Sequence, residues 1–187
     1  MKNILLILTS LLSIIINTSL LSGQQIQPVS TKNGTVYYED VVSTSGNISK
    51  QDLFSKTKQW VASNYPSTLT YSPVQLEDER NGIIIVNINL GKIQCSKCNY
   101  SYDNITCSAK LQFKDNKYKY TLTHFKAMFN ITSEGSRYTS ESDFDDFFKK
   151  EKLYKGDLEI LTELDNKVKK VIDSLIQALK EPVVENF

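Results

Sequence analysis

The sequence has no excess of charge of either sign, because 21 acidic residues match its 22 basic residues. A balanced chain creates no long-range field that would attract nucleic acid or an anionic membrane. The chain also has a single histidine, His124, and only three cysteines, Cys95, Cys98 and Cys107. A zinc site with four ligands would have to use all of these side chains. Since Cys107 falls on the apolar side of its strand, the pattern favours a buried thiol over a metal ligand.

Sequence signatures of catalysis are missing as well. No serine lies in a G-x-S-x-G elbow, and no cysteine forms a recognisable nucleophile pattern with His124. Asp143, Asp145 and Asp146 resemble calcium ligands, but their segment lacks the glycine and the final glutamate of an EF-hand loop. We therefore predict a non-enzymatic protein with no cofactor and no metal ion.

The longest apolar run covers residues 4–16, directly behind the basic Lys2. It has the length of a signal-peptide core and is shorter than the about 20 apolar residues of a membrane-spanning helix. We predict that residues 1–23 are a signal peptide. Gln24 follows, so no cysteine is available there for lipid attachment. The mature chain is expected to be extracytoplasmic, in the periplasm, in the cell envelope or secreted, without stable membrane insertion.

The mature chain is predicted to form one domain. Residues 24–34 are polar, contain Pro28 and show no period, which indicates a mobile lead-in. The domain is expected to span residues 35–181, with an accessory insertion at residues 128–156 and a tail at residues 182–187.

Two amphipathic helices are predicted. The longer covers residues 157–180, with Asp157 as its N-cap and Pro182 beyond its end. Its apolar residues are spaced by three and four and form one stripe: Leu158, Leu161, Leu164, Val168, Val171, Ile172, Leu175 and Leu179. The other helix begins at a capping box of Ser49 and Asp52 and ends before Pro66.

Alternating apolar and polar residues predict the strands. We expect Ile84, Val86, Ile88 and Leu90 to face the helices, and Tyr118, Tyr120, Leu122 and His124 to share one side of a later strand. Residues 128–140 are predicted to be a loop, and residues 142–152 a short accessory helix behind a cap at Ser140 or Ser142. The predicted strands are residues 35–44, 69–76, 82–90, 105–114 and 118–124, the last two as a hairpin.

The order of these elements is β-α-β-β-β-β-α. It predicts the α+β class, with an antiparallel sheet of about five strands and two helices packed on one face. The short accessory helix adds to this core.

A set of packing and turn residues is shared with a known family. It consists of Tyr37, Tyr38, Glu39, Val41, Ser49, Lys50, Leu53, Trp60, Val61, Gly82, Ile84 and the hairpin of residues 111–122 around Asp115. With these residues the chain resembles the exported bacterial domain-of-unknown-function family DUF 4468, which implies a TBP-like fold. The family offers no catalytic residues, and residues 91–104 and 130–155 depart from its pattern.

Cys95 and Cys98 form a C-x-x-C motif. Its flanks are typical of a strand or hairpin, whereas a thioredoxin-like motif opens a helix whose N-terminus lowers the thiol pKa. In an exported chain we expect a structural disulfide instead. The pairing is open: Cys95 with Cys98, or either of them with Cys107.

Four residues are candidates for contact with a ligand: Tyr100, Tyr102, His124 and Arg137. Aromatic clusters bind sugars or peptides, although on a half-buried sheet they also form cross-strand pairs. His124 is expected to be partly buried and hydrogen-bonded. We predict a binding or interaction module of the cell envelope, whose partner is an envelope protein or glycan and not nucleic acid. The alternatives are a thiol/disulfide protein that uses the C-x-x-C motif, and a hydrolase with an unrecognised site.

Overall fold

The computed structural model describes residues 28–68, 71–96, 100–133 and 136–180. The predicted signal peptide and the predicted C-terminal tail lie outside these ranges. Within them, no helix combines the length and the apolar character needed to cross a membrane.

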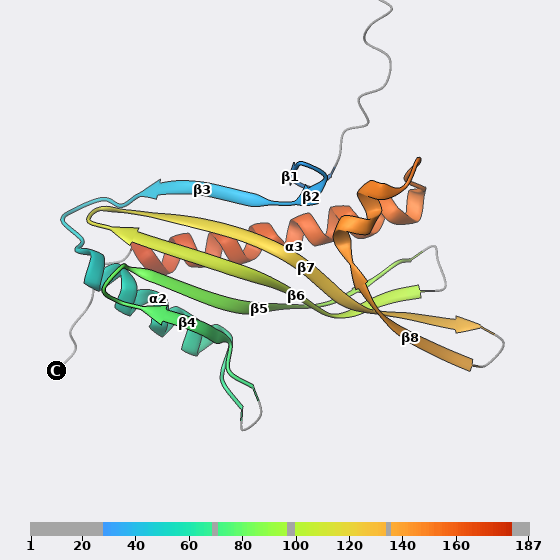
Figure 1. Ribbon diagram of the computed structural model, residues 1–187, viewed down its shortest axis with the longest axis horizontal. Coiled ribbons are helices and arrows are strands. Elements are labelled where there is room, and N and C mark those ends of the chain that lie inside the picture. Colours follow the sequence, from blue (N-terminus) through green and yellow to red (C-terminus); the bar gives the residue numbers. More distant parts are fainter. Residues whose placement is uncertain (1–27, 69–70, 97–99, 134–135, 181–187) are drawn as a thin grey trace, which may run out of the picture.

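The protein is α+β, with one antiparallel sheet of six strands where the sequence predicts about five (Figure 1). The strands lie in the order β3-β7-β6-β5-β4, and β8 pairs with the second half of β7. A separate two-stranded sheet, β1-β2, precedes them. The elements are β1 (Thr31–Lys32), β2 (Thr35–Val36), β3 (Tyr38–Ser43), α2 (Lys50–Asn64), β4 (Val74–Asp78), β5 (Ile83–Gln94), β6 (Tyr100–Lys114), β7 (Lys117–Ser133), β8 (Ser136–Asp143), the 3-10 helix η1 (Phe144–Lys149) and α3 (Lys155–Lys180).

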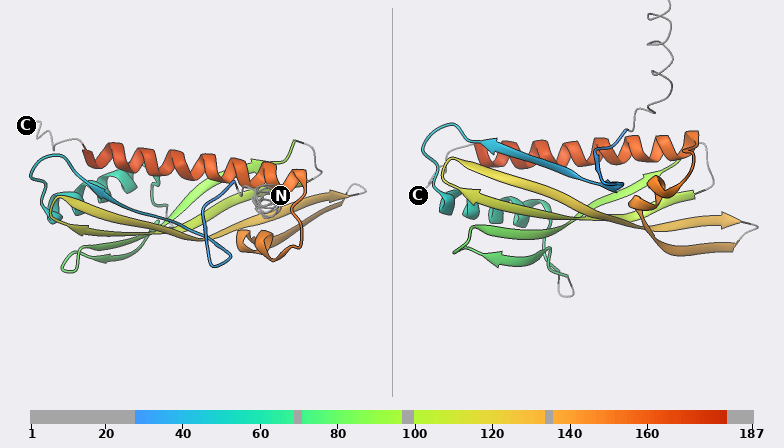
Figure 2. Two further views of the ribbon diagram at one scale, coloured as in Figure 1. Left: turned by 90° about the horizontal axis from the view of Figure 1, so that it is seen from above. Right: turned by 45° about the horizontal axis from the view of Figure 1, so that its top comes forward.

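Both α-helices pack on one face of the sheet, and α3 lies lengthwise along it (Figure 2). The predicted inward residues of β5 are confirmed, since Ile84 and Val86 are 0% exposed and Ile88 is 1% exposed. Leu161 and Leu164 of α3 are also fully buried against this face. At about 25 cal/mol per Å², this apolar burial is the main force that holds α3 on the sheet.

The N-terminus of α3 differs from the prediction. The helix begins at Lys155, so Asp157 lies inside its first turn and is not the N-cap. Its carboxylate accepts a hydrogen bond from the backbone N–H of Tyr154 (2.9 Å) and pairs with the ammonium of Lys150 (2.9 Å). Asp157 therefore still satisfies a free backbone donor at the helix end, from a position within the helix.

A buried hydrogen bond joins α3 to β3. The Tyr38 hydroxyl donates to Asp165 Oδ1 (2.9 Å), and Lys169 pairs with the other oxygen of the same carboxylate (2.6 Å). Burial, and next the bond to Asp165, raise the pKa of Tyr38 above its ordinary value. This contact fixes the edge strand against the middle of the long helix.

A bend crosses the sheet where three neighbouring strands each hold one extra residue with positive φ: Gly91 (φ 79°), Asn104 (φ 48°) and His124 (φ 56°). Such bulges shift which residues point inward and increase the local twist. In β7 the next inward-pointing residue after Leu122 is therefore Phe125, and the two are 2% and 0% exposed. The predictions that His124 shares the inward side and is partly buried are wrong, because His124 occupies the bulge and is exposed.

The prediction of a loop at residues 128–140 is wrong, because β7 and β8 form a hairpin there. The strand β8 is an edge strand with polar residues on both sides, so it has no apolar alternation that would reveal it. The prediction for residues 142–152 holds only in part. A shorter 3-10 helix, η1, forms, and its cap is Asp143, not Ser140 or Ser142.

The segment before β3 also differs from the prediction. Residues 28–34, predicted as part of a mobile lead-in, contribute β1 to the small sheet, and Val29 is only 5% exposed. The fold therefore begins at least as early as Val29.

Candidate ligand-binding surface

Several residues that carry the family resemblance meet at one corner of the molecule, where the turn between β6 and β7 reaches the start of α2. Ser49 and Asp52 form the predicted capping box. The turn adds further caps, since Asp115 Oδ1 accepts the backbone N–H of Lys50 (2.8 Å) and Asn116 Oδ1 accepts that of Ile48 (2.9 Å). The β-hairpin thus supplies an acceptor for the first N–H group of α2 and another for the residue before its N-cap, both far away in the sequence.

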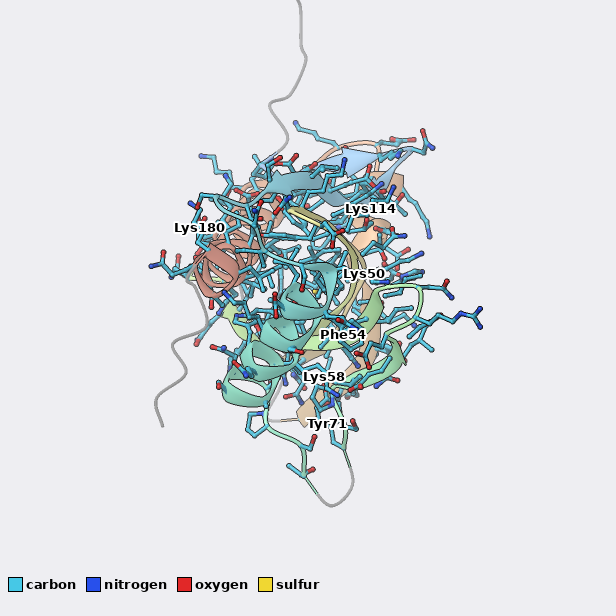
Figure 3. The ribbon with its side chains drawn as sticks, turned by 90° about the vertical axis from the view of Figure 1, so that its left-hand side faces the viewer. Lys50, Phe54, Lys58, Tyr71, Lys114 and Lys180 are labelled. Carbon is cyan, nitrogen blue, oxygen red and sulfur yellow. The ribbon has the colours of Figure 1, made fainter. Side chains whose placement is uncertain are left out.

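Gly82 completes this corner. Its φ is +64°, and a Cβ atom there would lie 2.9 Å from both Lys50 Cδ and the carbonyl oxygen of Phe113. The Lys50 ammonium in turn donates to the carbonyl oxygen of Arg80 (3.0 Å). These residues hold two turns and a helix together, so the shared motif is structural. Figure 3 looks at this end of the molecule, with Lys50 and Lys114 labelled.

The sheet face opposite the helices carries a groove of about 450 Å³ beside this corner. The groove lies on the side of β6 and β7 that faces away from the helices. On β6 that side carries Gln112 and Lys114, because Leu111 and Phe113 face the helices. On β7 it carries Lys117 and Lys119, which lie opposite them. The groove is lined by Val41, Asn81, Gln112, Phe113, Lys114, Lys117, Tyr118 and Lys119.

Lysines dominate this groove, and one of them has an anionic partner. Lys119 pairs with Glu39 of β3 at 2.7 Å. The hydrogen bond from Lys119, and next the one from Tyr37, lower the pKa of Glu39 to about 2. Lys114 and Lys117 lie directly opposite each other on β6 and β7. Like charges at such cross-strand positions repel, so their placement opposes sheet stability.

The described cysteines are Cys95 and Cys107. Cys107 is free and buried on the inward side of β6, as its alternation predicts, and burial raises the pKa of its thiol to about 12. A buried thiol that stays protonated at neutral pH is a poor nucleophile. The two pairings that involve Cys107 are therefore not found. Cys98 lies outside the described residues, so the pairing of Cys95 with Cys98 stays a prediction.

A second hollow, of about 400 Å³, lies between the end of β5 and α3. Its lining includes Lys92, Glu159 and Glu163. Glu159 accepts a hydrogen bond from the backbone N–H of Ser96 (2.7 Å), which anchors the segment after Cys95 to the helix. The lining of this hollow is mixed in charge.

Of the predicted ligand-facing residues whose side chains are described, Tyr100 and Tyr102 lie together, with ring centroids 6.1 Å apart, and His124 lies apart from them at the bend. Tyr102 is 6% exposed and packs against Phe129, with ring centroids 5.0 Å apart. Tyr100 is half-buried at the edge of the same cluster. His124 is exposed at the bend and shares a hydrogen bond with Thr123 (2.9 Å), so the expectation that it is hydrogen-bonded holds. Arg137 belongs to β8, but its side chain lies outside the described part.

The three aspartates considered for calcium have structural contacts. Asp143 accepts the backbone N–H of Asp145 (2.9 Å), Asp145 accepts that of Val36 (2.7 Å), and Asp146 pairs with Lys149 (2.6 Å). Among the described residues no cluster of three or more histidine, cysteine or acidic side chains is arranged to hold a metal ion.

Comparison with known proteins agrees with this architecture. Similar structures are a TBP-like protein from Parabacteroides distasonis (16% identity, TM-score 0.66, 81% of this chain and 97% of that chain covered) and a DUF4468 family protein from Bacteroides ovatus (13% identity, TM-score 0.59, 86% and 95% covered). No curated protein matches the sequence. Residues 37–127 match the family described as "Domain of unknown function (DUF4468) with TBP-like fold", and this chain carries a domain of that family.

Proposed function

We propose that this chain is an exported, non-enzymatic binding module that docks a component of the cell envelope on the open face of its sheet. One observation carries the proposal: α2 and α3 both cover the same face, and no other described helix covers the opposite face of the central sheet. That face exposes Val41 (56%) and Leu76 (45%) beside the lysine groove. A surface of this kind is suited to a partner and lacks an enclosed site for chemistry.

The docking face is tested by site-specific photo-crosslinking in envelope extract of the source cells. A photoreactive residue replaces Ser108 of β6, which points away from the helices, and in a control it replaces the exposed Gln177 of α3. We expect a discrete adduct at position 108 that excess unlabelled protein removes, and no such adduct at position 177. Equal labelling at the two positions, or none at position 108, would contradict the proposal.

Export is supported by the apolar run at residues 4–16. It is tested by cell fractionation and by the intact mass of the mature protein. We expect the protein outside the cytoplasm with a new N-terminus close to Gln24. A full-length chain in the cytoplasm would overturn this part of the proposal.

We also propose a structural bridge between Cys95 and Cys98. Cys107 is free, so Cys98 is the only other cysteine of the chain that could pair with Cys95. Thiol mapping by mass spectrometry should find one bridge that reductants open slowly and Cys107 as the free thiol. A rapidly reduced bridge would favour the alternative function, a thiol/disulfide protein.

A further inference from the structure

We propose that the groove on the open sheet face binds an acidic peptide segment of a protein partner, whose carboxylates contact Lys114 and Lys117. The inference rests on the proposed function and names its ligand class. The groove, about 450 Å³ in volume, has room for a few residues of such a segment.

The register of the sheet concentrates positive charge at this place. Lys114 pairs with Lys117 across the β6–β7 hairpin, Gln112 pairs with Lys119, and Lys110 follows in the next row. All of these side chains point away from the helices, since the residues between them are the buried Leu111, Phe113, Tyr118 and Tyr120. Four ammonium groups thus share one end of a face on a chain whose net charge is only +1.

Few carboxylates offset this charge. No acidic residue lines the groove. Glu39 is engaged with Lys119, and the two oxygens of Asp78 accept hydrogen bonds from Asn81 (3.0 and 2.7 Å). Within the described ranges, no ion pair is found for Lys110, Lys114 or Lys117.

Other lysines of the chain differ in this respect. Lys58 pairs with Glu77 at 2.8 Å, and Lys126 pairs with Glu141 at 2.9 Å. Both pairs join neighbouring elements at exposed positions, where a carboxylate is available within reach. A carboxylate brought by a ligand would complement the uncompensated lysines of the groove in the same way.

The remaining lining of the groove favours a peptide over a sugar or a nucleic acid. Proteins stack sugars and bases on exposed aromatic rings. The rings at this groove are buried on the helix side, since Phe113 is 3% and Tyr118 is 1% exposed. What faces the ligand is apolar Val41 together with the amides of Gln112 and Asn81, which can hydrogen-bond a peptide backbone.

The experiment measures the fluorescence anisotropy of a labelled peptide in which Asp and Ala alternate. The intact protein is expected to bind it, to bind the matched Asn and Ala peptide much more weakly, and to lose affinity as salt is added. The double variant Lys114→Gln/Lys117→Gln should weaken binding by about tenfold. The control Lys152→Gln/Lys170→Gln, which removes two exposed lysines outside the groove, should change it less than about twofold.

Three results would overturn the inference. They are equal affinity for the acidic and the neutral peptide, unchanged binding by the groove variant, and tighter binding of a single-stranded oligonucleotide or a sulfated glycan than of the acidic peptide. Thermal melts of both double variants check that they fold. If crosslinking at position 108 succeeds while the peptide does not bind, only the ligand class is wrong. If both fail, the proposed function fails too.

Discussion

At the scale of single residues, His124 shows how one backbone conformation bends a strand. Its φ of 56° lies in the left-handed region, where a β-branched residue is strained by about 1–2 kcal/mol. We expect His124→Val to lower the free energy of unfolding by that amount, and His124→Asn or His124→Gly to leave it within about 0.5 kcal/mol, because the imidazole is exposed. Urea unfolding measures all three.

Thr123→Val is the matched control for His124→Val, since it introduces the same side chain at the preceding position, where φ is not positive. Both variants lose the exposed hydrogen bond between Thr123 and His124, so Thr123→Val should lower stability clearly less than His124→Val. A loss as large as that of His124→Val would show that the bulge does not explain the effect.

The thiol of Cys107 makes stability depend on alkaline pH. Burial raises its pKa from an ordinary value of 9.0 to about 12. Between these values the unfolded chain releases the proton and the folded chain keeps it, so the unfolded state binds fewer protons and the free energy of unfolding falls as pH rises. The slope is about 1.4 kcal/mol per pH unit for this group, and below pH 9 the contribution is fully present.

Cys107→Ala should therefore show a shallower decline of stability above pH 9, by about 1.4 kcal/mol per pH unit, in parallel urea titrations. Tyr65 and Tyr102, whose pKa values burial raises to about 12, contribute to the decline in both proteins. Identical slopes for the two proteins would mean that the thiol ionises as easily in the fold as in water.

At the scale of elements, the start of α2 depends on a turn that lies 65 residues further along the chain. Asp115 accepts the backbone N–H of Lys50 at 2.8 Å, as an N-terminal cap does. Asp115→Ala should lower the free energy of unfolding by about 1 kcal/mol. The exposed Asp173 of α3 is the control, and Asp173→Ala should change stability by less than about 0.5 kcal/mol. Equal urea midpoints for the two variants would argue against the cap.

The elements that the sequence predicts well are those whose periodicity reflects burial. The strand with Ile84 and Val86 and the helix with Leu161 and Leu164 each present one face to the core, so their apolar spacing follows the geometry. The strand β8 has no such face, because it only borders β7. The bulge at His124 breaks strict alternation, which explains why Phe125 was not expected in the core.

The candidate groove could not be recognised from residue types, since its lysines look like the ordinary polar side of a hairpin. A signal did exist in the spacing, because a two-residue turn at Asp115 and Asn116 sets the register that places Lys114 opposite Lys117. Val41 joins the groove from β3 and Asn81 from the turn between β4 and β5, and only the folded sheet order brings them there.

At the scale of the whole molecule, the two faces of the sheet have different tasks. The helix side buries the apolar residues that stabilise the fold, and the open side carries lysines whose like charges repel each other. The proposed binding role would account for the repulsive pair of Lys114 and Lys117, because a binding site can be retained at a cost in stability.

We expect the substitution Lys117→Glu to raise the stability of the fold and to lower its affinity for the acidic peptide. Lys117→Glu replaces repulsion with attraction opposite Lys114, so the free energy of unfolding should rise by about 0.5 kcal/mol. The same change places a carboxylate in the groove, so affinity for the acidic peptide should fall. Lys152→Glu, with the same charge change at an exposed site outside the groove, should leave both quantities nearly unchanged. Urea unfolding and fluorescence anisotropy measure them on one preparation. A Lys117→Glu variant that is less stable and binds the acidic peptide equally well would contradict both expectations. The lower stability would show that no repulsion is relieved, and the unchanged affinity would show that the peptide does not contact this groove.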